Sequence, residues 1–76
     1  MEVFGKRVKQ ELHLQGKKQK DLCEYLQVNK STLSEWLNNH NEPPMQIIAD
    51  IARFLDVSTD YLFGLENWNW LLPIDI

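Results

Sequence analysis

The sequence predicts one small all-α domain of five helices, followed by an extended apolar tail. Apolar residues recur three and four positions apart in successive segments, as on the buried faces of helices. Before residue 65 no segment shows the alternation expected of a strand of normal length. The 76 residues include one cysteine, so helix packing without an internal disulfide must hold the fold. We place the domain at residues 1–65 and the tail at residues 66–76.

The first segment has the pattern of an amphipathic helix. Phe4, Val8 and Leu12 repeat every four residues, which places them on one face. Gly16 follows, and glycine commonly ends a helix because it adopts positive φ without strain. We therefore expect a helix over about residues 2–14.

Residues 19–38, QKDLCEYLQVNKSTLSEWLN, have the pattern of two short helices joined by a tight turn. The apolar positions are Leu22, Cys23 and Leu26 in the first helix, Val28 in the turn, and Leu33, Trp36 and Leu37 in the second. This spacing predicts a helix-turn-helix with Trp36 in the core. The polar side chains left on the second helix suit base edges and phosphates better than catalysis.

Two further helices are expected downstream. Pro43 and Pro44 cannot lie inside a helix but commonly begin one. The apolar pattern that follows predicts a helix over about residues 44–55, with a buried face formed by Ile48, Ile51, Ala52 and Leu55. Ser58 is a good cap for a short fifth helix that ends at Gly64.

The chain resembles the Cro and phage-repressor (XRE-type) helix-turn-helix family over roughly residues 4–64. The resemblance is carried by FGKRVK, QKDLCEYLQV, KSTLSEW, the proline at 43 and ARFLDVSTDYLFG, in that order and with the family's spacing. It implies a lambda-repressor-like fold. It also implies sequence-specific binding of double-stranded operator DNA, by a homodimer that represses transcription from a palindromic site, without catalysis or a cofactor.

The sequence departs from the family pattern at three positions. Gln27 stands where the family usually has the turn glycine, so a residue with a side chain is expected to take a left-handed conformation. Lys18 stands where Ser or Thr usually caps the first motif helix. Leu37 stands where Glu is common.

The base-contacting candidates lie on the second motif helix. They are Asn29, Lys30, Ser31, Ser34 and Glu35. Asn29 is expected to cap the helix, which leaves Lys30 and Ser31 at the end that enters the major groove. Ser34 and Glu35 follow one turn later.

Glu35 has two interpretations. Its carboxylate is suited to accept a hydrogen bond from a cytosine amino group. Because phosphates repel a carboxylate, pairing with Lys30 or Lys20 is the alternative.

The phosphate-contacting candidates surround the two motif helices. They are Lys17, Lys18, Gln19, Lys20, Asn38, Asn39 and Asn41. The lysines crowd a helix start, where unpaired N–H groups favour an anion. Gln19 looks like the family's phosphate-clamping glutamine, and a solvated lysine run is the alternative for the three cations. The three asparagines are also typical turn formers.

The net charge of −3 and the pI near 5.2 conceal an asymmetry. Residues 1–38 carry seven basic and five acidic side chains, whereas residues 39–76 carry one basic and six acidic ones. A basic half that contains the motif and an acidic half that faces away are compatible with oriented DNA binding. The alternative is that the acidic half is simply a solvated face.

The sequence shows no motif for metal binding, catalysis or membrane insertion. His13, His40 and Cys23 match no common zinc spacing, so we expect no metal, and Cys23 falls on a buried helix face. No nucleophile motif or phosphate-cradling glycine loop is present, so we expect no enzyme activity. No apolar run has signal-peptide or membrane-span length, which predicts a cytoplasmic protein without a membrane partner.

The tail, ENWNWLLPIDI, is too apolar to remain free in water. We expect it to form a dimer interface through Trp68, Trp70, Leu71, Leu72 and Ile74, with packing on its own domain as the alternative. Two other functions stay open. One is a DNA-binding antitoxin or autoregulator whose tail holds a protein partner, and the other is a protein-interaction module that shares the fold without binding DNA.

Overall fold

The computed structural model describes residues 2–65, and all regular structure in that range is helical. The helices are α1 (Glu2–Leu14), α2 (Gln19–Leu26), α3 (Lys30–Leu37), α4 (Met45–Leu55) and α5 (Thr59–Leu62). The predicted five-helix all-α domain is therefore confirmed. The predicted tail lies outside the described residues.

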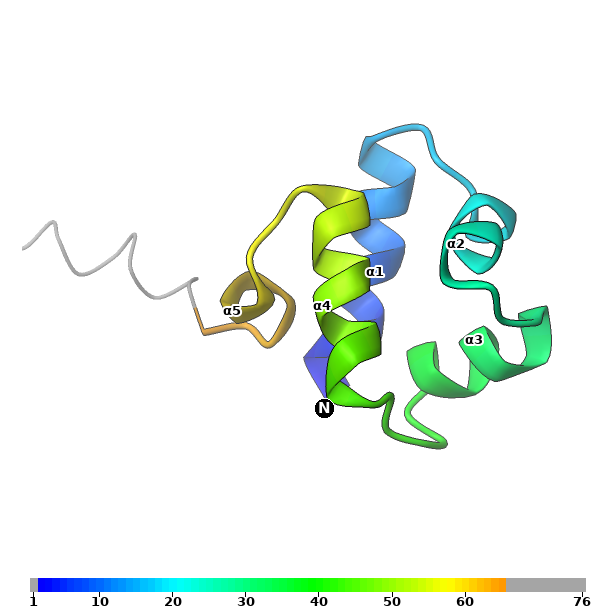
Figure 1. The fold of residues 1–76 in the computed structure, drawn as a ribbon. Coiled ribbons are helices and arrows are strands. Elements are labelled where there is room, and N and C mark those ends of the chain that lie inside the picture. The colour runs from blue at the N-terminus through cyan, green and yellow to red at the C-terminus, as the bar shows by residue number, and fades with distance from the viewer. Residues whose placement is uncertain (1, 66–76) are drawn as a thin grey trace, which may run out of the picture.

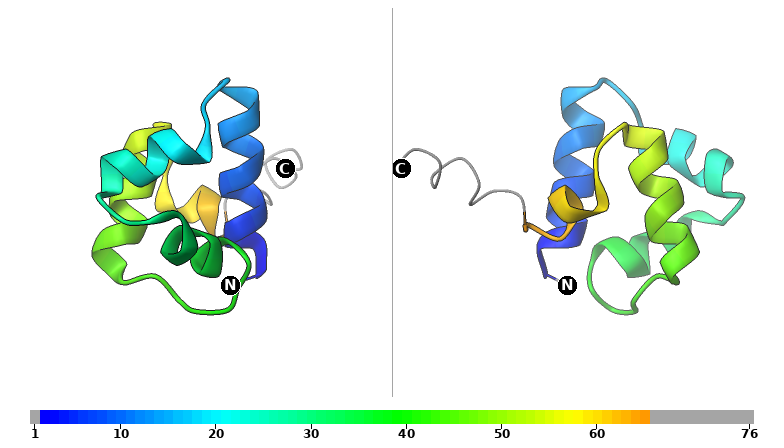
Figure 2. Two further views of the ribbon diagram at one scale, coloured as in Figure 1. Left: turned by 90° about the vertical axis from the view of Figure 1, so that its right-hand side faces the viewer. Right: turned by 60° about the vertical axis from the view of Figure 1, so that its left-hand side comes forward.

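The helices α1 and α4 lie side by side at the centre, with α2 and α3 on one side of them and α5 on the other (Figure 1). Seen from the α2 and α3 side, the two motif helices cover the front of the molecule (Figure 2). The motif is thus at the surface, and it is supported from behind by the central pair.

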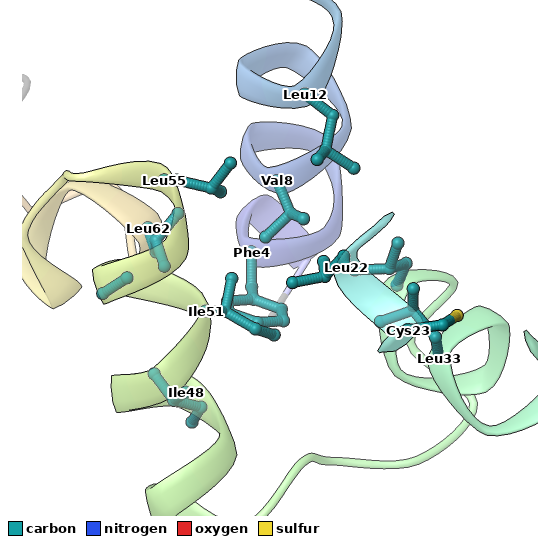
Figure 3. Packing of buried hydrophobic residues seen from close by; sticks show 12 residues of the cluster. Phe4, Val8, Leu12, Leu22, Cys23, Leu33, Ile48, Ile51, Leu55 and Leu62 are labelled. Carbon is teal, nitrogen blue, oxygen red and sulfur yellow. The ribbon is translucent and has the colours of Figure 1, made fainter. Parts of the chain in front are cut away.

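The core is entirely apolar in the described part of the chain. Phe4, Val8 and Leu12 of α1 run down its middle and face α4 and α5 on one side and α2 and α3 on the other (Figure 3). The predicted buried positions of α4 are also in the core, which holds Ile48, Ile51, Ala52 and Leu55. Trp36 is only half-buried and packs against the edge of this cluster, so the expectation that it lies in the core holds in part.

Each described helix is followed within two residues by a residue of positive φ. These residues are Gly16, Gln27, Asn39, Asp56 and Gly64. After α1, for example, the Lys17 N–H donates to the carbonyl of Leu12 at 2.8 Å and the Gly16 N–H to that of His13 at 3.1 Å, the Schellman arrangement. The predictions for Gly16 and for a left-handed Gln27 (φ 60°) are confirmed.

Two helix bounds differ slightly from the predictions. Helix α4 begins at Met45 because Pro44 is its N-cap, in extended conformation. Helix α5 ends at Leu62, since Phe63 and Gly64 form the turn that follows. Ser58 caps α5 as expected, because its hydroxyl accepts the N–H of Tyr61 at 3.0 Å.

Candidate nucleic-acid interface

Helix α3 begins with exposed polar side chains. The Asn29 Oδ1 accepts the backbone N–H of Thr32 at 2.8 Å, which confirms Asn29 as the N-cap. This bond occupies the side-chain oxygen and leaves the amide NH₂ as the group available for a ligand. Lys30 and Ser31 are exposed, and neither side chain bonds another described residue.

The second turn of α3 is less exposed and makes its own hydrogen bonds. Ser34 is half-buried as a residue, and its hydroxyl accepts a hydrogen bond from the Nδ2 of Asn38 at 3.1 Å. The exposed Glu35 carboxylate accepts the Nδ2 of Asn41 at 2.8 Å. The described residues hold no ion pair between Glu35 and Lys30 or Lys20, so the alternative interpretation of Glu35 does not describe this structure.

The start of helix α2 exposes two of the predicted cations, Lys18 and Lys20. Lys18 is the N-cap, but an ammonium group cannot accept a helix N–H. Instead the Asp21 Oδ2 accepts the backbone N–H of Lys18 at 3.1 Å, and Gln19 is half-buried at the first helical position. The side-chain cap that the family usually places here is missing, which leaves helix N–H groups open to an anion.

Lys17 is used differently from its two neighbours. Its Nζ donates to the carbonyl oxygen of Phe54 at 3.0 Å and lies 4.7 Å from the centroid of the Phe54 ring. A cation at the carbonyl end of α4 complements the helix dipole. Lys17 therefore joins the α1–α2 loop to α4 within the domain.

The asparagines after α3 have three different environments. Asn38 lies between Ser34 and α1, where its Oδ1 accepts the Nζ of Lys9 at 2.8 Å. Asn39 has φ 64° and ends the helix, which agrees with the turn-forming interpretation. Asn41 reaches back to α3.

A family model described as helix-turn-helix matches residues 8–62, which include α2, α3 and the turn between them. The chain belongs to the XRE-type helix-turn-helix family. This is a family of DNA-binding transcription regulators.

Among curated proteins, the chain is 32% identical over 64 residues to the HTH-type transcriptional regulator ImmR of Bacillus subtilis (strain 168). The alignment covers 84% of this chain and 50% of the relative, so the chain spans about half the length of the relative it matches. No solved structure matches the chain.

One residue behind the helix-turn-helix was missed by sequence reasoning. A Cβ added to Gly5 would overlap the backbone carbonyl oxygen of Leu37, so glycine at this point lets α1 and the end of α3 approach closely. A glycine inside the amphipathic pattern of the first helix was the available signal, because glycine is unfavourable there without a packing reason.

A polar cluster on the far side of α1 was also missed. The Tyr61 hydroxyl donates to the Glu11 Oε2 at 2.9 Å, and the Arg7 guanidinium lies 4.6 Å from the centroid of the Tyr61 ring. The Arg7 Nη1 also donates to the Tyr61 carbonyl at 3.3 Å, and the Gln15 Nε2 to the Leu55 carbonyl at 2.8 Å. Burial raises the pKa of the Tyr61 phenol above 10.0, and the hydrogen bond to Glu11 raises it further.

Two exposed acidic side chains of the second half of the chain lie away from the helix-turn-helix. Asp56 and Asp60 are exposed at the end of α4 and on α5, which lies across the central helix pair from α2 and α3 (Figure 1). Asp50 is instead paired with Arg53 at 2.9 Å. This arrangement leaves the cations at the start of α2 and α3 unopposed by the acids of α5.

The described residues offer few other sites. Within residues 2–65 no three His, Cys, Asp or Glu side chains are grouped so that they would hold a metal ion, and no pocket opens on the surface. None of the described helices is long and apolar enough to cross a membrane. Cys23 is buried, as its position on the apolar face predicts.

Proposed function

We propose that this protein binds double-stranded operator DNA sequence-specifically, with the start of α3 in the major groove. The observation that carries the proposal is the start of α3, where Lys30 and Ser31 are exposed and bond no other described side chain. Side chains at the start of the second motif helix are the ones that meet base edges in helix-turn-helix proteins. Membership of the family supports the same conclusion.

Phosphate contacts position the protein on the duplex in this proposal. Lys18, Gln19 and Lys20 lie at the uncapped start of α2, where N–H groups and cations together favour a phosphate. The asparagines at 38, 39 and 41 are a second set of phosphate ligands at the other end of α3. Lys17 is not among the phosphate ligands in this proposal, because its ammonium group bonds α4 and joins the loop before α2 to that helix.

Base reading extends one turn along α3. Asn29 offers its amide NH₂, Lys30 and Ser31 meet the bases next to it, and Ser34 and Glu35 read the following positions. Because Asn41 donates to only one oxygen of the Glu35 carboxylate, the other stays available to accept a hydrogen bond from a cytosine amino group.

We further propose that the protein acts as a homodimer that represses transcription. Two half-sites about one helical turn of DNA apart give tighter and more selective binding than one, and a two-fold dimer matches a palindromic operator. The dimer contacts are assigned to the tail beyond residue 65, at Trp68, Trp70, Leu71, Leu72 and Ile74. Their large apolar side chains are typical of interface centres.

Selection of bound sequences from a pool of random duplex DNA tests the DNA-binding proposal. We expect a palindromic consensus of two half-sites. Recovery of unenriched sequences at low salt would contradict the proposal and favour a protein-interaction module on the same fold.

Sedimentation equilibrium of the full chain and of a chain ending at Leu65 tests the dimer assignment. The shorter chain should be a folded monomer that binds DNA weakly. If it dimerises as tightly as the full chain, the tail is not the interface, and if it unfolds, the tail packs on its own domain.

A further inference from the structure

A chain of two hydrogen bonds connects α1 to the middle of α3. The Lys9 Nζ on α1 donates to the Asn38 Oδ1 at 2.8 Å, and the Asn38 Nδ2 donates to the Ser34 Oγ at 3.1 Å. Helices α1 and α3 pack directly on each other in this region (Figure 2). The residue at the start of this chain, Lys9, is outside the helix-turn-helix itself.

The chemistry of the three groups fixes the direction of both bonds. A lysine ammonium donates hydrogen bonds and accepts none, so it must face the oxygen of the Asn38 amide. The NH₂ end of the same amide then faces Ser34, whose hydroxyl oxygen has to accept. The Ser34 hydroxyl proton bonds no other described residue, so it remains available as a donor.

We infer that Lys9 and Asn38 are positioning residues that make Ser34 a hydrogen-bond donor toward the DNA base it faces. This inference rests on the proposed binding of duplex DNA. In the major groove guanine, thymine and adenine present acceptors, whereas cytosine presents only its amino donor. Because Asn38 takes one of the two lone pairs of the Ser34 oxygen and leaves its proton free, Ser34 is a better donor than acceptor, so cytosine is disfavoured at one position of each half-site.

The Ser34→Ala variant identifies that position. Sequences selected from random duplex DNA by the wild-type chain and by Ser34→Ala should differ at one position per half-site. There the wild-type chain should bind the cytosine-containing duplex about three- to tenfold more weakly than the best duplex, the range expected for one hydrogen bond.

Two substitutions should reverse the direction of the Ser34 hydroxyl by different routes. In Asn38→Asp the carboxylate only accepts, so it takes the Ser34 proton while keeping its pairing with Lys9. In Lys9→Glu the Asn38 amide turns its NH₂ toward the new carboxylate and its oxygen toward Ser34. In both variants Ser34 then faces the base as an acceptor, and cytosine or adenine should become the preferred base at that position.

Matched variants separate this effect from added negative charge. Asn39→Asp adds the same charge one residue away, at a position of positive φ that aspartate tolerates. Lys6→Glu reverses a charge at another exposed position of α1. Both controls should lower affinity for all duplexes alike and leave the base preference unchanged, and circular dichroism checks that every variant is folded.

The possible results are distinct. An unchanged preference in folded Asn38→Asp and Lys9→Glu, or the same change in the two controls, would overturn the inference. If Ser34→Ala alters no position while the wild-type chain still selects a consensus, Ser34 reads no base, and the inference fails although the proposed function stands. If the wild-type chain selects no sequence, both fail.

Discussion

The two faces of the domain use polar side chains in opposite ways. Toward α5, Arg7, Glu11 and Gln15 bond to Tyr61 and to backbone carbonyls of the domain. On the side of the helix-turn-helix, Lys30 and Ser31 at the start of α3 bond no other described side chain. The first set stabilises the fold, and the second is left available for a ligand. Substitutions on the two faces should therefore separate stability from DNA binding.

The largest effect is expected where α1 meets the end of α3. Gly5→Ala should lower the free energy of unfolding by about 3 kcal/mol, because the added Cβ would overlap the Leu37 carbonyl. Urea denaturation measures the loss, with Lys6→Ala as a control in the same helix. Without the overlap, replacing a helical glycine by alanine stabilises by up to about 1 kcal/mol, so an unchanged or higher stability would contradict the close approach.

Substitutions at the start of α3 should affect binding and leave stability unchanged. Lys30→Ala and Ser31→Ala should each weaken binding to the selected site by about 1 to 3 kcal/mol where a base contact is lost. Fluorescence anisotropy with selected and shuffled duplexes measures the change.

Lys18→Ala removes a proposed phosphate contact and is compared with the two variants that remove base contacts. It should weaken binding to selected and shuffled duplexes alike. The slope of the logarithm of affinity against the logarithm of salt concentration should fall in magnitude by about one, since one counterion fewer is released. If Lys30→Ala, Ser31→Ala and Lys18→Ala all retain wild-type affinity and selectivity, this surface does not contact DNA.

On the opposite face, Tyr61→Phe should lower stability by about 1 kcal/mol without affecting DNA binding, since it removes the hydrogen bond to Glu11. The pKa of the Tyr61 phenol is raised in the folded state. Its contribution to the free energy of unfolding is therefore complete below about pH 10 and is lost as the pH rises through the folded-state pKa.

Unfolding measured between about pH 8 and pH 11 checks the sign of this effect. The wild-type chain should be more stable than Tyr61→Phe at about pH 8, and this difference in the free energy of unfolding should shrink toward about pH 11. Tyr25→Phe is the control, because the Tyr25 hydroxyl bonds no other described residue. An advantage that grew with pH would contradict the assignment.

The smallest effect is expected in the turn between α2 and α3. Gln27 has φ 60°, a conformation that costs an ordinary side chain about 1 kcal/mol or more. Gln27→Gly should therefore raise stability by up to about 1 kcal/mol in thermal unfolding. Asn39→Gly should gain less, since asparagine tolerates this conformation, and an equal gain at both positions would show that Gln27 carries no particular strain.

The sequence predicts local features well and long-range polar contacts poorly. Helix periodicity located Phe4, Val8 and Leu12 in the core, and cap chemistry identified Asn29 and Ser58, because both depend on neighbours within one turn. The contact of Lys17 with Phe54 joins residues 37 positions apart, which no local pattern encodes. The same holds for Lys9 and Asn38, 29 positions apart, so the likeness to the family indicated a candidate interface but not its internal bonds.

The central claim is that the surface formed by the starts of α2 and α3 binds duplex DNA by sequence. The most direct test is the affinity of the wild-type chain for a selected and a shuffled duplex between about 50 and 200 mM salt. We predict that the logarithm of affinity falls linearly with the logarithm of salt concentration for both, with the selected duplex about 10³-fold tighter or more. Equal affinity for the two duplexes, or no measurable binding at the lowest salt, would contradict the claim.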